Sequence, residues 1–163
     1  MRVEFINPFV ESAYSILKEY FAEAVKRKEL SLKATSMSIL GVAAMVGLAG
    51  DVEGRVLFDM SKETALNVSN TMAKSIGMTD TYTELNEESS SIIMELANQI
   101  TAQAITKLHE LGFKFDLTPP AIFTGDNMVV STSLGNVEAL VVPMDLGPIG
   151  KIEVNVVIRE RIK

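Results

Sequence analysis

The sequence predicts an α+β fold in which long helices pack on an antiparallel sheet. Segments with helical periodicity and segments with a β-like pattern are grouped along the chain as helix, strands, two helices and strands. Consecutive strands usually pair antiparallel, which favours this class over a doubly wound parallel sheet. The chain has 163 residues, 47% of them apolar, enough to bury a core without staples. We therefore expect a single domain, residues 1–163.

The first predicted helix covers residues 7–21, where apolar side chains recur at helical spacing and gather on one side. Asn7 stands directly before Pro8. Asn is a favourable N-cap, and Pro suits the first helical position. Because Pro disfavours a helical conformation in the residue before it, we expect Asn7 to cap this helix and Glu4 to lie before it.

A β-like region follows from Leu30 to Met60, with a turn at Gly50–Asp51. Ser61 then has the residue type of an N-cap, and Gly77 that of a stop signal, so the residues between them predict a second helix. The residues expected to face the core from this helix are Ala65, Val68, Met72 and Ile76.

The third predicted helix is the longest and runs from Asn86 to Leu111. Gly112 suits the position after its end, and acidic residues 87–88 lie in its first turn, where the helix dipole favours carboxylates. At about 100° per residue its apolar side chains share one face. These core-facing residues are Ile93, Leu96, Ala97, Ile100 and Ala104.

The remainder of the chain is β-like. The segments with strand patterns are 113–117, 121–125, 127–133, 137–144 and 151–160, with turns at 125–127 and 145–148. The last segment alternates and ends in charged residues, which is typical of an edge strand or a swapped strand.

The first and third helices also show a faint internal repeat. Aligning Asn7 with Asn98 without gaps matches an Ala and a Leu further along each helix, and each helix is followed by a set of strands. Two amphipathic helices can share this much by chance. Alone, the repeat is therefore weak support for a duplicated unit of helix plus strands.

Composition excludes several classes of function. The chain has no Cys and a single His, His109, which rules out disulfide scaffolds and thiolate chemistry and leaves little for a metal centre. A net charge of −6 disfavours nucleic acid, and the basic triplet at 26–28 is more typical of a solvated helix end. We see no secretory signal and no apolar run of about 18 residues, so we expect a cytoplasmic protein without membrane insertion.

Two polar groups lie on the third helix opposite its predicted core face. Glu95 and Asn98 are three residues apart, so their Cβ atoms are expected about 5–6 Å from each other on one outward side. Ser91 and Ala102 flank the pair and are small, which would leave both side chains accessible. The spacing alone is weak support for a site, because an exposed face needs polar residues and the same spacing recurs near the N-terminus.

A longer sequence pattern indicates a functional role for Glu95 and Asn98. Residues 82–125, with "DLTPP" at 116–120, resemble the CheX branch of the CheC/CheX/FliY chemotaxis phosphatases, and so do 7–17, 47–58 and 61–68. The signature of that family is Ser or Asp, then Glu four residues later, then Asn three further on, and Pro beyond. Here these residues are Ser91, Glu95, Asn98 and Pro119–Pro120.

The resemblance implies a CheC/CheX-like fold and hydrolysis of the aspartyl phosphate of a CheY-type response regulator. It implies that the third helix docks across the regulator's active site, where Asn98 orients the attacking water and Glu95 pairs with the regulator's lysine. Mg²⁺ would be bound by the regulator, so we expect no cofactor of this chain's own. A homodimer is also implied, with one working site per chain and none at Glu4 and Asn7.

The sequence departs from the family pattern beside the pair. Met94, Leu96 and Ala97 surround it, and Ala102 follows it, at places where members of the branch often have Gly. Larger side chains there would restrict how closely a partner approaches. One alternative is therefore a module that binds a receiver domain or a flagellar-switch component without hydrolysis. Another is an α+β structural domain with no such partner.

Overall fold

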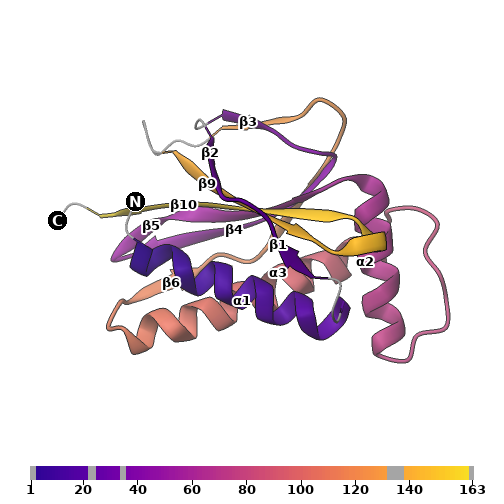
Figure 1. Ribbon diagram of the computed structural model, residues 1–163, viewed down its shortest axis with the longest axis horizontal. Helices are drawn as coiled ribbons and strands as arrows, with labels where there is room; N and C mark the ends of the chain where they lie inside the picture. The colour runs from indigo at the N-terminus through magenta and orange to yellow at the C-terminus, as the bar shows by residue number, and fades with distance from the viewer. Residues whose placement is uncertain (1–2, 22–24, 34–35, 132–137, 162–163) are drawn as a thin grey trace.

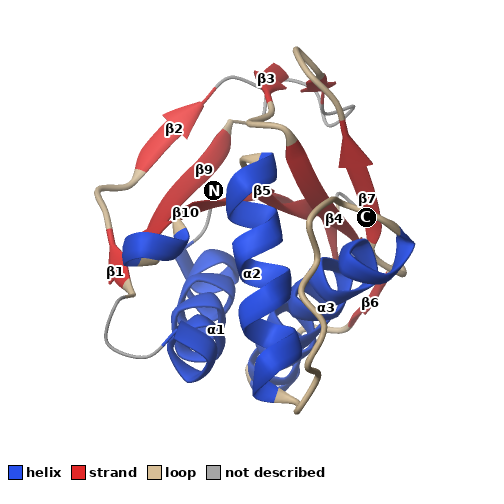
Figure 2. Ribbon diagram, turned by 90° about the vertical axis from the view of Figure 1, so that its right-hand side faces the viewer, coloured by secondary structure: helices blue, strands red, loops and turns tan. Residues whose placement is uncertain are grey.

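The structure is a computed structural model that describes residues 3–21, 25–33, 36–131 and 138–161. Within this part of the chain, two long helices lie side by side against one face of an eight-stranded sheet, and a third helix stands at one end of the sheet (Figures 1 and 2). The helices are α1 (Val3–Phe21), α2 (Lys62–Ser75) and α3 (Glu87–Glu110), with a 3₁₀ turn η2 (Gly147–Ile149). The strands are β1 (Lys26–Arg27), β2 (Ser31–Lys33), β3 (Ser36–Ser38), β4 (Val42–Gly50), β5 (Val52–Met60), β6 (Phe115–Leu117), β7 (Ala121–Thr124), β8 (Val129–Ser131), β9 (Ala139–Asp145) and β10 (Lys151–Glu160).

The large sheet has the strand order β1–β9–β10–β5–β4–β6, and these pairs are antiparallel. β2 also pairs with β9, and β7 with β4. β6 and β7 are separated by Thr118–Pro120, where the two prolines offer no N–H to a ladder. The predicted α+β class, with antiparallel pairing after each set of helices, is confirmed.

β10 is not an edge strand, which corrects the expectation for the C-terminal segment. It pairs with β5 on one side and with β9 on the other. Residues 152–158 are all buried, because both faces of the strand are covered. Val156 belongs to the main core beneath the helices, whereas Val157 belongs to a smaller core on the opposite face, against which Val130 of β8 packs.

α1 begins at Val3, earlier than the sequence predicts, so Pro8 lies inside the helix. Asn7 is therefore not its N-cap, and Glu4 is a helical residue rather than one that precedes the helix. Both expectations were wrong. The local preference of a Pro-containing segment did not decide where this helix starts.

Burial of the first turn explains the early start of α1. Pro8 removes one intrahelical hydrogen bond, and an interior Pro costs about 3 kcal/mol or more. The first turn buries Phe5 and Ile6, each contributing about 1.5–3 kcal/mol. The Phe5 ring also packs edge-on against Phe113, with ring centroids 4.7 Å apart. Tertiary packing therefore offsets the local cost.

The other helix ends lie where the sequence predicts them. The Ser61 hydroxyl caps α2 by accepting a hydrogen bond from the backbone N–H of Thr64 at 3.1 Å. Asn86 caps α3 in a reciprocal capping box with Ser89. Gly112 follows α3 with φ +91°, a left-handed conformation that favours Gly at this position.

The predicted core faces of α2 and α3 are confirmed except at one residue. Ile76, expected to point inward, is 73% exposed, because it is the C-cap of α2, where the chain leaves the helix and helical periodicity ends. The buried residues among those predicted are Ala65, Val68, Met72, Ile93, Leu96, Ala97, Ile100 and Ala104. Among the described helices, none is long and apolar enough to cross a bilayer.

The basic triplet 26–28 does not lie at a helix end. Lys26 and Arg27 form β1, and Lys26 is paired in register with Asp145 of β9. The Lys28 ammonium lies 3.6 Å from the carboxylate of the same Asp145. Lys26 and Lys28 thus both have an acidic residue on the neighbouring strand.

Candidate functional site

Glu95 and Asn98 lie on the exposed side of α3, as the sequence predicts. Both are exposed, as are the flanking Ser91 and Ala102. The opposite side of the helix is buried in the main core, and α1 lies alongside α3 (Figures 1 and 2). The structure therefore brings an acid and an amide together on the accessible side of a well-supported helix.

The N-terminal end of α3 is tied to the rest of the protein by polar contacts. The side chain of Asn86 accepts from the backbone N–H of Ser89 at 2.9 Å, and the Ser89 hydroxyl accepts from the backbone N–H of Asn86 at 2.8 Å. The buried hydroxyl of Ser69 in α2 donates to the carbonyl of Ser89 at 3.0 Å. These bonds fix the first turn of α3 and so the direction in which the helix presents its outer side.

The carboxamide of Asn98 is left available. Within the described part of the chain, the side chain of Asn98 forms no hydrogen bond; besides the bonds of the helix, its backbone carbonyl accepts one from the Thr101 hydroxyl at 3.2 Å. A carboxamide both donates and accepts hydrogen bonds and does not titrate. Asn98 can therefore orient a small polar molecule, such as water, that a partner brings to it.

The carboxylate of Glu95 has a neighbour that sequence reasoning missed. Its Oε1 accepts a hydrogen bond from the Nε2 of Gln99 at 3.2 Å. The Oε1 of Gln99 in turn accepts from the hydroxyl of Tyr20, in the last turn of α1, at 2.8 Å. The i, i+4 spacing of Glu95 and Gln99 was a signal for the first contact. Nothing local in the sequence signals the second, which joins residues of two different helices.

Two of the departures from the family pattern lie away from the exposed surface. Leu96 and Ala97 are each 1% exposed and belong to the main core. They cannot restrict the approach of a partner, which corrects the expectation that they would. Met94 is half-buried and Ala102 is exposed, so these two residues alone among the four are placed to affect docking.

Ser91 and Thr118, the residue before the proline pair, form structural hydrogen bonds. The Ser91 hydroxyl donates to the carbonyl of Glu87 at 2.8 Å. Pro119–Pro120 follow Thr118, whose hydroxyl accepts from the backbone N–H of Gly47 at 2.8 Å. Thr118 N–H also donates to the Gly47 carbonyl at 2.9 Å. This pair of bonds joins "GLAGDVEGRVLF" (47–58) to "DLTPP" (116–120), two of the segments that carry the family resemblance.

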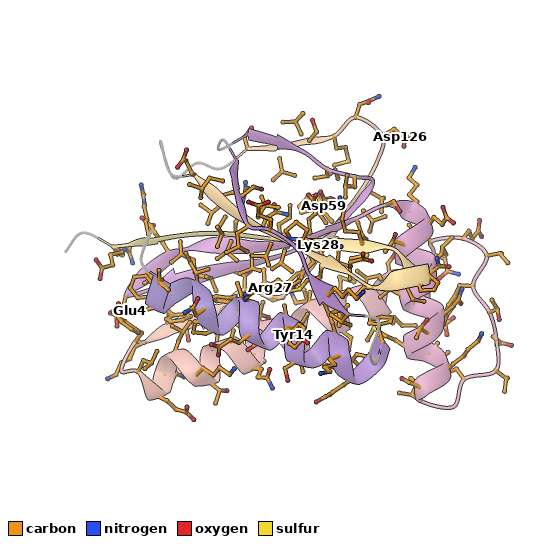
Figure 3. The ribbon with its side chains drawn as sticks, viewed as in Figure 1. Glu4, Tyr14, Arg27, Lys28, Asp59 and Asp126 are labelled. Carbon is orange, nitrogen blue, oxygen red and sulfur yellow. The ribbon has the colours of Figure 1, made fainter. Side chains whose placement is uncertain are left out.

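The second Glu–Asn pair is also helical and exposed, but its surroundings differ. Glu4 and Asn7 lie in the first turns of α1, where Figure 3 labels Glu4. The reason given for excluding a second site, that Asn7 is a cap, therefore no longer applies. Asn7 lines a groove of about 850 Å³, together with apolar side chains such as Ile6. The residue four places after Glu4 is Pro8, which cannot supply a side-chain donor like that of Gln99.

The described residues contain no group of three His, Asp or Glu side chains placed to bind a metal ion. His109 is exposed, with its Nε2 3.3 Å from the carbonyl of Phe115. It lies at the far end of α3 from Ser91 and is not brought into the Glu95–Asn98 site.

The sequence model of a known family matches this chain. The family is the chemotaxis phosphatase CheX, and the match covers residues 42–145, which include α2, α3 and both halves of the Thr118–Gly47 contact. The chain belongs to the CheX family. Its match covers more than half of the sequence, and the resemblance seen in the sequence is thereby confirmed.

Individual members of the family are similar over most of their length. The CheY-P phosphatase CheX of Thermotoga maritima is 27% identical over 132 residues, 81% of this chain and 83% of that protein. The CheX chain of a CheX–CheY–BeF₃–Mg²⁺ complex from Borrelia burgdorferi is 38% identical, with a TM-score of 0.77, covering 98% of this chain and all of that one (100%). CheX from Vibrio vulnificus has the same fold, at 23% identity, with a TM-score of 0.80 over 96% of this chain and 100% of that one.

Proposed function

We propose that this chain hydrolyses the aspartyl phosphate of a CheY-type response regulator. The observation that carries the proposal is the exposed Glu95–Asn98 pair on a helix of a CheX-family protein, in which the Asn98 carboxamide has no hydrogen-bond partner among the described residues. The Thermotoga relative is a CheY-P phosphatase, and the Borrelia relative forms a complex with CheY. Both relatives support the same substrate class for this chain.

In the proposed reaction α3 docks across the active site of the regulator. Water attacks phosphorus as the bond to the aspartate oxygen breaks, giving inorganic phosphate and a free aspartate carboxylate. Asn98 orients the attacking water through its carboxamide. Phosphoryl transfer depends chiefly on positioning and charge stabilisation, so this chain need not supply a nucleophile or a strong base. One well-placed transition-state hydrogen bond is worth on the order of 3 kcal/mol, roughly a hundredfold in rate.

Glu95 has the complementary role of binding. We place its carboxylate against the lysine of the regulator's active site, where an ion pair would set the register of the two proteins. Mg²⁺ is bound by the regulator in this proposal, and this chain uses no cofactor of its own.

Phosphate release from a phosphorylated receiver domain, with and without this chain, tests the proposal. We expect release to rise well above the receiver's own rate. Binding measured on the same pair separates the alternatives: binding without acceleration favours a non-catalytic module for receiver domains or the flagellar switch. Absence of both contradicts the proposal and leaves an α+β domain with no such partner.

We propose further that residues 1–163 act as one cytoplasmic domain and form a homodimer. Helices and sheet share one main core, and a receiver phosphorylated in the cytoplasm is the substrate.

β10 is central, so in the proposed homodimer the second copy must use another surface. We place the interface at the groove beside Asn7, because apolar Leu30 and Leu32, both substantially exposed, line it. Light scattering should give twice the mass of 17.8 kDa, and Leu32→Glu should return it to one copy; a monomer before substitution contradicts the dimer.

A further inference from the structure

We propose that Tyr20 and Gln99 are positioning residues that fix the carboxylate of Glu95 for contact with the regulator. The inference rests on the proposed function and adds to it two residues outside the family signature. It starts from one line of hydrogen bonds: the Tyr20 hydroxyl to Gln99 Oε1 at 2.8 Å, and Gln99 Nε2 to Glu95 Oε1 at 3.2 Å.

The order of donors and acceptors along this line has a single consistent direction. A carboxylate only accepts, whereas a carboxamide has one accepting and one donating end. With the Nε2 end of Gln99 toward Glu95, its oxygen is left for the Tyr20 hydroxyl, which donates. The reversed amide would place an oxygen of Gln99 against an oxygen of Glu95. The carboxylate of Glu95 therefore selects the amide orientation in which Gln99 donates to it, and the Tyr20 hydroxyl, which can donate or accept, holds the oxygen end of that amide in place.

The line runs from two partly buried residues to an exposed one. Tyr20 is partly buried and packs against the main core, Gln99 is partly buried, and Glu95 is exposed. An exposed Glu side chain loses rotamer freedom when a partner fixes it. Here a hydrogen bond from Gln99, which Tyr20 holds, restricts the Glu95 side chain before the partner arrives. Such preorganisation raises affinity because less entropy is lost on binding.

The rest of the α1–α3 contact does not depend on this line. Both helices contribute large buried side chains to the main core, among them Phe9 and Leu17 of α1 and Ile100 of α3. Removing one hydroxyl from Tyr20 leaves that packing in place. A purely structural role for the line would therefore affect stability slightly and the affinity for the regulator not at all.

The second Glu–Asn pair provides an internal comparison. Glu4 and Asn7 have the same spacing on a helix, but Pro8 stands where Gln99 stands in α3. Position 8 therefore has no side-chain amide to orient Glu4. A Gln four places after the Glu is thus a feature of the α3 pair alone, which the common spacing does not show.

The test compares Tyr20→Phe and Gln99→Ala with Tyr14→Phe, a matched control on the exposed side of α1 (Figure 3). KM and kcat for the phosphorylated receiver are measured, together with the Kd for the BeF₃-activated receiver. We expect Tyr20→Phe and Gln99→Ala to raise KM and Kd about three- to tenfold, with kcat within twofold of the unsubstituted chain. Tyr14→Phe should leave both KM and Kd unchanged. In a Glu95→Ala background the same two substitutions should have no further effect.

The outcomes separate this inference from the function on which it rests. If the unsubstituted chain accelerates phosphate release but Tyr20→Phe and Gln99→Ala leave KM and Kd unchanged, the inference alone is wrong. The same holds if their effects persist undiminished in the Glu95→Ala background. If the chain binds the receiver without hydrolysis, Kd still decides the inference. If it does not bind at all, both proposals are overturned.

Discussion

The side chains of Glu95 and Asn98 lie one turn apart on α3 and have different surroundings. The carboxylate of Glu95 accepts a hydrogen bond from Gln99, whereas within the described residues the carboxamide of Asn98 has no such partner. Helical periodicity was sufficient to predict that both would be exposed. It could not predict the contact from Tyr20, because residues 79 positions apart meet only in the folded protein.

The departures from the family pattern illustrate the same limit at single residues. The residue type at one position does not show whether its side chain contacts the partner or the core. Leu96 is 1% exposed, whereas Met94 is half-buried. Helical periodicity already placed Leu96 on the core face. The nearness of Leu96 to Asn98 in sequence nevertheless suggested an effect on docking, which the structure excludes.

Substitution of Leu96 and of Met94 should therefore differ in its effect on stability. Leu96→Ala is expected to lower the free energy of unfolding by about 2–5 kcal/mol, because it leaves a cavity in the core, while the folded variant binds the receiver normally. Met94→Ala should cost less stability, since its side chain is only half-buried. Urea denaturation and receiver titration measure the two effects. A Leu96→Ala variant of unchanged stability contradicts the placement of this residue.

At the scale of helices, the caps were predictable and the start of α1 was not. Ser61, Asn86 and Gly112 act through contacts within a few residues of their own positions, so local sequence contains the whole signal. The first turn of α1 is stabilised by Phe113, which follows α3. A distant contact thus outweighed the local preference of Pro8, and no pattern within residues 3–8 could show it.

The docking of this first turn can be tested directly. Phe5→Ala is expected to lower the free energy of unfolding by about 3–5 kcal/mol, because the ring is buried against Phe113. Val3→Ala, at a residue 63% exposed on the same turn, is the matched control and should change stability by no more than about 0.5 kcal/mol. Similar small effects of both substitutions would indicate that the turn is not docked.

At the scale of the whole molecule, the antiparallel sheet followed from the grouping of elements, but the place of β10 did not. The alternating pattern of its sequence suggested one polar face. In the structure Glu153 and Asn155 are on that face and are buried, because strands of the same chain cover it. Whether a polar face meets water depends on the full topology, which a single strand does not specify.

Hydrogen exchange distinguishes a central β10 from an edge strand. Amides of residues 152–158 should be among the slowest to exchange, since the strand is paired on both sides and buried on both faces. Amides of β1, a two-residue strand at the end of the sheet, should exchange much faster. Exchange of β10 at the rate of β1 would contradict the central position.

The central claim is that the carboxamide of Asn98 accelerates hydrolysis of the regulator's aspartyl phosphate. Single-turnover phosphate release, measured at a saturating concentration of this protein, tests the claim most directly. Asn98→Ala should reduce the acceleration roughly a hundredfold with an unchanged circular dichroism spectrum and melting temperature. Asn7→Ala, the matched change in the other pair, should leave the rate as it was. A rate for Asn98→Ala within about threefold of the unsubstituted chain, less than one hydrogen bond contributes, would contradict the account.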